Sequence, residues 1–139
     1  MGLNNSLHDR YATSIQAIYD RIQILYKDAN AVFMDIDMPE LKVRDLKNPT
    51  GQRNTFTYLW TIQEMIDLQN VLNHLIEVYN SYSLIDVLSG KPTDYIELWI
   101  PVMDLTLDKD YEAKMNNNFK LANKILDQLF EYIKPYKKG

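Results

Sequence analysis

Two sets of polar side chains in this 139-residue sequence have a spacing that could bind a metal ion or support acid–base catalysis. The first is a set of carboxylates. Asp35, Asp37 and Glu40 can offer oxygens to a hard cation such as Mg²⁺ or Ca²⁺. The signal is weak, because the glycine turn and final glutamate of a calcium loop do not follow. A metal-dependent hydrolase or nuclease that uses these carboxylates together with His74 is therefore the alternative hypothesis.

The second set is a histidine with polar neighbours at helical spacing. Asp67, Asn70, His74 and Glu77 follow one another at intervals of three and four residues, which places them on one face of a helix. The spacing His-Glu-x-x-His, a glycine-rich phosphate loop and a Gly-x-Ser-x-Gly elbow are all absent from the sequence. We therefore predict no catalytic residue, no metal site and no cofactor, and read this stripe as facing water or a partner.

A further acidic cluster is explained without a ligand. Asp104, Asp108, Asp110 and Glu112 precede or begin a segment with helical periodicity. Carboxylates are favoured there because the first amide groups of a helix are unpaired and carry partial positive charge. Asp108 is the expected capping residue of this helix.

These residues need helices to position them, and the apolar spacing predicts three. The first helix, over about 5–30, carries a stripe that suits either an antiparallel neighbour or the seam of a homodimer. The second, over about 56–82, has an apolar arc wide enough to make it the hub of the fold, with Trp60 in the core. The stripe of the first helix consists of Leu7, Tyr11, Ile15, Ile18, Ile22, Leu25 and Ala29.

The third helix is expected over about 108–134, and the segment before it is ambiguous. Pro135 stops the helix, and the poor helix formers Asn116, Asn117 and Asn118 predict a bend within it. Over 94–107 the apolar residues alternate as in a β-strand, whereas Pro101 disfavours a central strand. An edge strand and a helix broken at the proline both remain open.

The whole chain, 1–139, is predicted to form one all-α domain: a bundle of three long helices with short helical or strand segments. Pro39 and Pro49 interrupt the periodicity, so we expect a flexible loop at about 38–54. Four glycines and five prolines supply few turns for a β-rich fold. No apolar run approaches the roughly 18 residues of a membrane span.

Charge is distributed unevenly, which bears on the partner. Residues 54–112 hold ten acidic and two basic groups, whereas the segment from 113 onward is basic. The chain then either pairs its last helix with its middle or offers an acidic face to a basic partner. Because the basic residues do not form one stripe, nucleic-acid binding is not expected.

Together these patterns favour a non-enzymatic protein-binding module: an inhibitor, adaptor or immunity-type accessory protein, of a kind that phages and mobile elements encode. A structural or assembly protein is a further alternative. The lack of cysteine suits the cytoplasm, and a homodimer is expected. The candidate partner-binding residues are Asp67, Asn70, His74, Glu77, Asp94, Glu97, Trp99 and Asp104.

Overall fold

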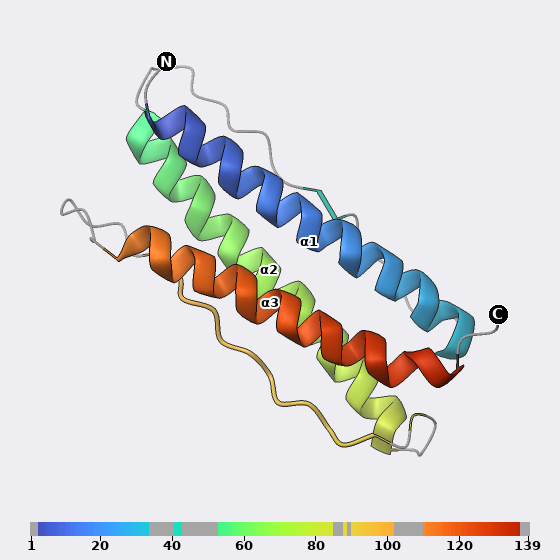
Figure 1. Ribbon diagram of the computed structural model, residues 1–139. Coiled ribbons are helices and arrows are strands. Elements are labelled where there is room, and N and C mark those ends of the chain that lie inside the picture. The colour runs from blue at the N-terminus through green and yellow to red at the C-terminus, as the bar shows by residue number, and fades with distance from the viewer. Residues whose placement is uncertain are drawn as a thin grey trace.

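Three long helices make up most of the structure, a computed structural model (Figure 1). They are α1 (Leu3–Phe33), α2 (Arg53–Leu84) and α3 (Tyr111–Ile133), followed by a short 3-10 helix, η1 (Lys134–Tyr136). The prediction of an all-α bundle is confirmed, and none of the described residues lies in a β-strand. The structure describes residues 3–33, 41–42, 53–84, 88, 90–101 and 110–136.

The helices begin and end close to the predicted residues, with two differences. Arg53 and Asn54, the last residues of the flexible loop expected over 38–54, belong to α2, and of the rest of that segment only residues 41–42 are described. The residue that precedes α3 is Asp110 instead of Asp108, and its side chain makes no capping hydrogen bond. Pro135 ends the α-helix as predicted, since Ile133 is the last α-helical residue and the proline lies in η1.

All three helices run in the same direction, which corrects the expectation of an antiparallel neighbour (Figure 1). Arg10 of α1 pairs with Glu112 near the start of α3, and Arg21 pairs with Asp127 further along. Antiparallel helices suit short connections, whereas 34–52 and 85–110 are long enough to lead the chain back along the bundle. The described segment 90–101 does so, running beside α2 and α3.

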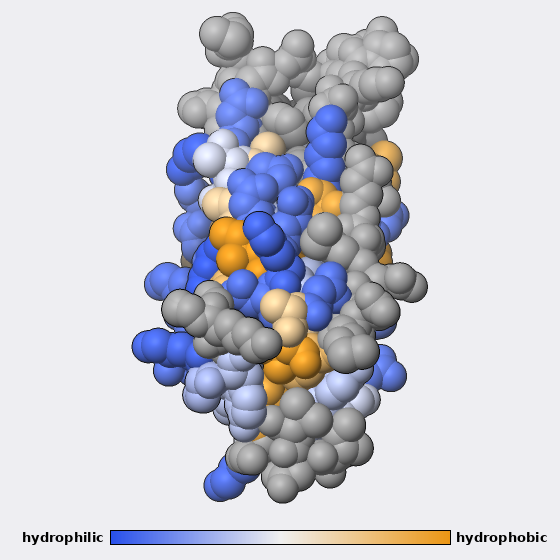
Figure 2. All heavy atoms as spheres, turned by 90° about the vertical axis from the view of Figure 1, so that its right-hand side faces the viewer, coloured by the Kyte–Doolittle hydropathy of each residue, from blue (hydrophilic) through white to orange (hydrophobic). Residues whose placement is uncertain are grey.

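The apolar stripe of α1 faces the inside of its own chain. Most of the stripe is almost completely buried by the other helices and by Leu41, whose carbonyl oxygen accepts a hydrogen bond of 2.9 Å from Gln23. The seam predicted for a homodimer is therefore already covered. Figure 2 shows one outer face of the bundle, where the described hydrophobic residues form only small patches among hydrophilic ones. The covered positions of the stripe are Tyr11, Ile15, Ile18, Ile22, Leu25 and Ala29.

The apolar arc of α2 is shared between the other helices and the returning segment. Trp60 is 6% exposed, which confirms it as a core residue. The prediction that α2 is the hub is wrong: α2 contacts both other helices, but the most extensive helix contact joins α1 to α3. Ile96 and Leu98 of the returning segment join the same core and take the place of a helix beside α2. None of the described helices is long and apolar enough to cross a membrane.

Arg21 makes the principal polar contact between α1 and α3. One guanidinium nitrogen donates to Asn123 Oδ1 at 2.6 Å, and another lies 2.5 Å from Asp127 Oδ1. The guanidinium carbon also lies 5.5 Å from the centre of the Phe130 ring. The planar guanidinium group of Arg21 donates to two oxygens of α3 and stacks near an aromatic ring at the same time. Arg21 therefore fixes the register of the two helices.

Replacing Arg21 should therefore cost more stability than replacing the exposed Arg10. We expect Arg21→Ala to lower the free energy of unfolding by about 1–2 kcal/mol. Arg10→Ala removes a pair whose side chains are 61% and 54% exposed, and should change it by less than about 0.5 kcal/mol. Urea unfolding followed by circular dichroism measures both, and equal effects would contradict the special role of Arg21.

Two tyrosine hydroxyls are buried where α1 and α2 meet. The Tyr26 and Tyr79 hydroxyls have no hydrogen-bond partner among the described residues. Burial raises the pKa of Tyr26 to about 12. Burial also raises the pKa of Tyr79, and the negative charge of Asp28 raises it further. The folded protein therefore holds both phenols neutral in a pH range where an unfolded chain releases their protons.

This difference makes stability fall at high pH. The contribution of Tyr26 is complete below its unfolded pKa of 10.0 and is lost as the pH rises to its folded pKa of about 12. The free energy of unfolding should therefore decrease less steeply with pH in Tyr26→Phe than in the wild type, by at most about 1.4 kcal/mol per pH unit. Urea unfolding between about pH 9 and pH 12 tests it, with the exposed Tyr95→Phe as control. Identical slopes in the wild type and Tyr26→Phe would refute the assignment.

Candidate protein-binding surface

The predicted polar stripe forms an open face of α2. Asn70, His74 and Glu77 are exposed, and Asp67 is half-buried with its carboxylate accepting a hydrogen bond of 3.0 Å from Gln63. The helix periodicity places these residues away from the side that packs in the core. The structure therefore brings the four predicted α2 residues together on one surface. The fully buried residues on the opposite side of α2 are Met65, Leu68, Leu72, Leu75 and Ile76.

Beside this face lies an extended segment, residues 91–101, which we call the strap. Thr93, Ile96 and Leu98 of the strap are buried, whereas Asp94 and Glu97 are exposed. The ambiguous segment 94–107, for which an edge strand and a broken helix are both open, is described as far as Pro101. Its described residues form neither, because the main chain finds its partners in helix side chains instead of another strand.

The strap is held by a row of carboxamide side chains, which we call the amide ladder: Gln69, Asn73 and Asn80 of α2 and Asn118 of α3. Each asparagine bonds both main-chain groups of one strap residue. The amide of Thr93 donates to Asn80 at 2.7 Å, and Asn80 donates back to the Thr93 carbonyl at 2.8 Å. Asn73 makes the same pair with Ile96, at 2.8 and 3.0 Å. Gln69 accepts from the Leu98 amide at 2.7 Å.

The spacing of the ladder follows from the geometry of the two kinds of chain. Seven residues of α-helix rise about 10.5 Å, and three residues of extended chain span about 10 Å. Asn80 and Asn73, seven apart, therefore meet Thr93 and Ile96, three apart, with the strap antiparallel to α2. Gln69 and Leu98 continue the register, because four helical residues match two extended ones. The ladder thus holds the strap through its main chain.

Asn118 closes the ladder from α3. Its carboxamide accepts from the Trp99 amide at 2.7 Å and donates to the Trp99 carbonyl at 2.8 Å. The predicted bend at Asn116–Asn118 is wrong, since α3 is helical throughout and Asn118 is buried to reach the strap. The Trp99 ring is only partly exposed, because Lys114 Nζ lies 5.1 Å from its centre and Tyr111 packs edge-on at 5.4 Å.

The strap extends the acidic face of α2. Glu77 lies between Asn73 and Asn80, so it is level with the strap residues between Ile96 and Thr93. Asp94 therefore adds its charge beside Glu77, and Glu97 lies one residue beyond Ile96. Tyr95, 62% exposed, is the most exposed large hydrophobic side chain of the strap. We call the whole surface the α2–strap face, made of Asp67, Asn70, His74, Glu77, Asp94, Tyr95 and Glu97.

Several predicted residues lie outside the described part of the chain. Asp104, proposed to contact a partner, is one, and the carboxylates Asp35, Asp37 and Glu40 of the metal-site alternative are others. Among the residues that are described, no three histidine, aspartate or glutamate side chains gather in a way that would hold a metal ion. The residues that sequence reasoning missed form the amide ladder, whose signal was asparagine at a spacing of seven.

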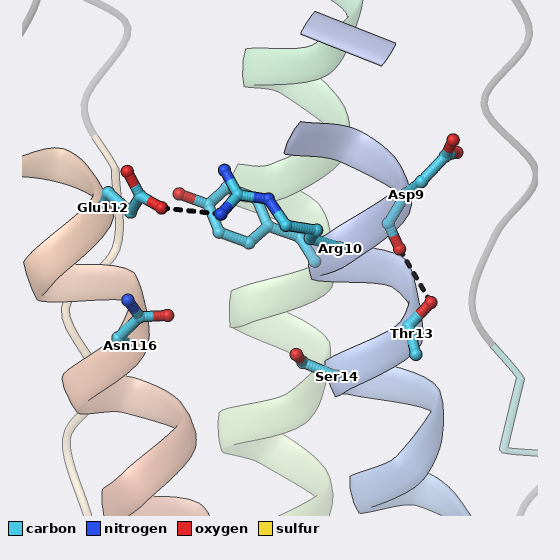
Figure 3. A pocket seen from close by; sticks show the side chains of 7 residues that line it. Asp9, Arg10, Thr13, Ser14, Glu112 and Asn116 are labelled. Carbon is cyan, nitrogen blue, oxygen red and sulfur yellow. Dashed lines mark hydrogen bonds and ion pairs between the residues drawn. The ribbon is translucent and has the colours of Figure 1, made fainter. Parts of the chain in front are cut away.

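An open pocket of about 480 Å³ lies between the N-terminal parts of α1 and α3 (Figure 3). Arg10 reaches across it to Glu112 at 3.0 Å, and the Thr13 hydroxyl donates to the Asp9 carbonyl at 2.8 Å. No histidine lines the described part of this pocket, and Ser14 has no base beside it. Arg10 and Glu112 pair with each other across it, and the described lining offers no nucleophile with a base beside it.

Comparisons of the chain with protein-family models, with curated proteins and with solved structures find no match.

The ladder predicts a large difference between two neighbouring asparagines of α2. Asn73→Ala deprives the buried main chain of Ile96 of two hydrogen bonds and should lower the free energy of unfolding by about 2 kcal/mol. Asn70→Ala, an exposed position in the same helix, should change it by less than about 0.5 kcal/mol. Urea unfolding compares them, and similar losses would mean that the ladder does not hold the strap.

Proposed function

We propose that this protein is a non-enzymatic binding module that presents its α2–strap face to a basic surface of a partner protein. The carrying observation is the exposure of Glu77, Asp94 and Glu97 on adjacent parts of one face. Neighbouring like charges repel one another in the free protein, and a basic partner would relieve that repulsion. This charge would also steer the encounter with such a partner.

The ion pairs of Arg10 and Arg21 do not use the carboxylates of the α2–strap face, which supports its availability to a partner. Arg10 and Arg21 of α1 are paired with Glu112 and Asp127 of α3, so these ion pairs join the facing sides of α1 and α3. Exposed Tyr95 and Ile66, 62% and 36% exposed, add apolar contact area within or beside the acidic residues. Aromatic side chains with charged neighbours are typical anchors of protein interfaces.

The finer assignment remains that of an inhibitor, adaptor or immunity-type accessory protein of a phage or mobile element, acting in the cytoplasm. The absence of cysteine supports a reducing compartment. The homodimer expected from the sequence would need a surface other than the stripe of α1, which is buried within one chain. We assign the α2–strap face to a different protein because its like charges would repel the same face of a second copy.

Charge reversal on this face tests the proposal. We expect Asp67→Lys combined with Glu77→Lys to weaken capture of the partner from a lysate of the native host by at least about tenfold, since each reversal replaces attraction with repulsion of about 1 kcal/mol. Capture by the wild type should also weaken as salt is raised. Mass spectrometry of the captured proteins gives the readout.

The matched control reverses two exposed acidic residues on other helices, Asp20→Lys of α1 and Glu131→Lys of α3. It changes the net charge by the same amount and should leave the capture of that partner intact. Equal loss with both double variants would show a general charge effect, and capture indifferent to the α2 reversals or to salt would refute the proposal.

A further inference from the structure

The groove between α2 and α3 recognises an extended chain by its main chain. Seven hydrogen bonds from the amide ladder reach the backbone of Thr93, Ile96, Leu98 and Trp99. Main-chain bonds of this kind are available to any extended peptide, and pockets for alternate side chains then supply selectivity. The groove is therefore built like a peptide receptor, with the strap as its occupant inside the same chain.

The strap fills this groove imperfectly. Thr93 is 9% exposed, and its hydroxyl oxygen is buried without a hydrogen-bond partner among the described residues. A buried hydroxyl that has lost its water costs free energy which a methyl group at the same position would not. A segment with valine in this place would therefore fit the groove better than the strap does.

The charge of the strap is also mismatched with its surroundings. Asp94 and Glu97 are exposed on both sides of Ile96, and Glu77 of α2 lies level with this part of the strap. Like charges on adjacent parts of one exposed face repel one another, so Asp94 and Glu97 do not help to hold the strap, and only Lys91 of the strap carries the opposite charge. Basic residues in the two strap positions would turn this repulsion into attraction.

We propose that the groove between α2 and α3 receives an extended segment of a partner protein that displaces the strap. The segment is apolar at the positions of Thr93, Ile96 and Leu98 and basic at those of Asp94 and Glu97. This inference rests on the proposed function and refines it: Glu77 and Asp67 of α2 remain to meet the basic segment, whereas Asp94 and Glu97 leave the face together with the strap. In the free protein the strap covers the apolar side chains of the groove. A partner segment of this pattern would reach them by taking the place of the strap.

Two synthetic peptides test the proposal on the intact protein. One has the sequence of residues 91–101, and the other carries Thr93→Val, Asp94→Lys and Glu97→Lys in that sequence. We expect the substituted peptide to bind at least about tenfold more tightly, from two charge changes of about 1 kcal/mol each. Nuclear magnetic resonance of isotope-labelled protein should show the amides of Ile96 and Leu98 losing protection as it binds. Added salt should reduce the difference in affinity between the two peptides.

A variant of the ladder and a property of the wild type serve as controls. Asn73→Ala combined with Asn80→Ala should abolish binding of both peptides while circular dichroism still shows a helical protein. In the wild type without peptide, hydrogen exchange at Ile96 and Leu98 should be faster than at Leu72 and Leu75 of α2, because the strap opens without global unfolding. This second measurement does not depend on whether the variant folds.

The outcomes separate this inference from the proposed function. Exchange of the strap amides only with global unfolding, or no binding of either peptide, would show the strap to be a permanent part of the core. Equal binding of the two peptides would overturn the basic pattern of the segment. If either result came with partner capture that still depended on Asp67 and Glu77, the inference alone would fail. Loss of that dependence would refute the proposed function.

Discussion

The structure depends on supplying hydrogen bonds to a main chain that crosses an apolar surface without a β-sheet. A strap that buries Ile96 and Leu98 against helices also takes its amide and carbonyl groups out of water. An unpaired buried main-chain group costs about as much as a lost hydrogen bond, so the segment could not stay there unaided. The carboxamides of the ladder satisfy this requirement, since each asparagine presents a donor and an acceptor as another strand would.

The helices were predictable from sequence because burial alone determines them. The repeat of apolar residues placed α1, α2 and α3 within a few residues of their observed bounds and assigned Trp60 to the core. Their direction was not predictable, because an apolar stripe packs equally well against a parallel or an antiparallel helix. That choice depends on where the connections run, and periodicity carries no information about it.

The site was partly predictable for a related reason. The α2 residues of the binding face were found because three-four spacing reports which side of a helix is polar. The ladder escaped because Asn73 and Asn80 looked like the edge of the same polar stripe, and Asn118 looked like a helix breaker. Their role depends on a segment distant in sequence whose conformation is not set by its own residues. Asparagines seven apart, beside an alternating apolar segment that cannot form a sheet, are the pattern to look for.

The parallel arrangement of the helices also bears on how the chain folds. Arg10 and Glu112 are separated by 102 residues, and Arg21 and Asp127 by 106, although each pair lies in one short layer of the bundle. An up-and-down bundle forms its contacts between helices joined by tight loops, and such local contacts give fast folding. Here the main polar contacts of α1 can form only after α3, 102 to 106 residues later in the sequence, has reached it. Closing these long loops between α1 and α3 costs more chain entropy than joining helices through tight turns, so we expect slower folding than in an up-and-down bundle of the same size.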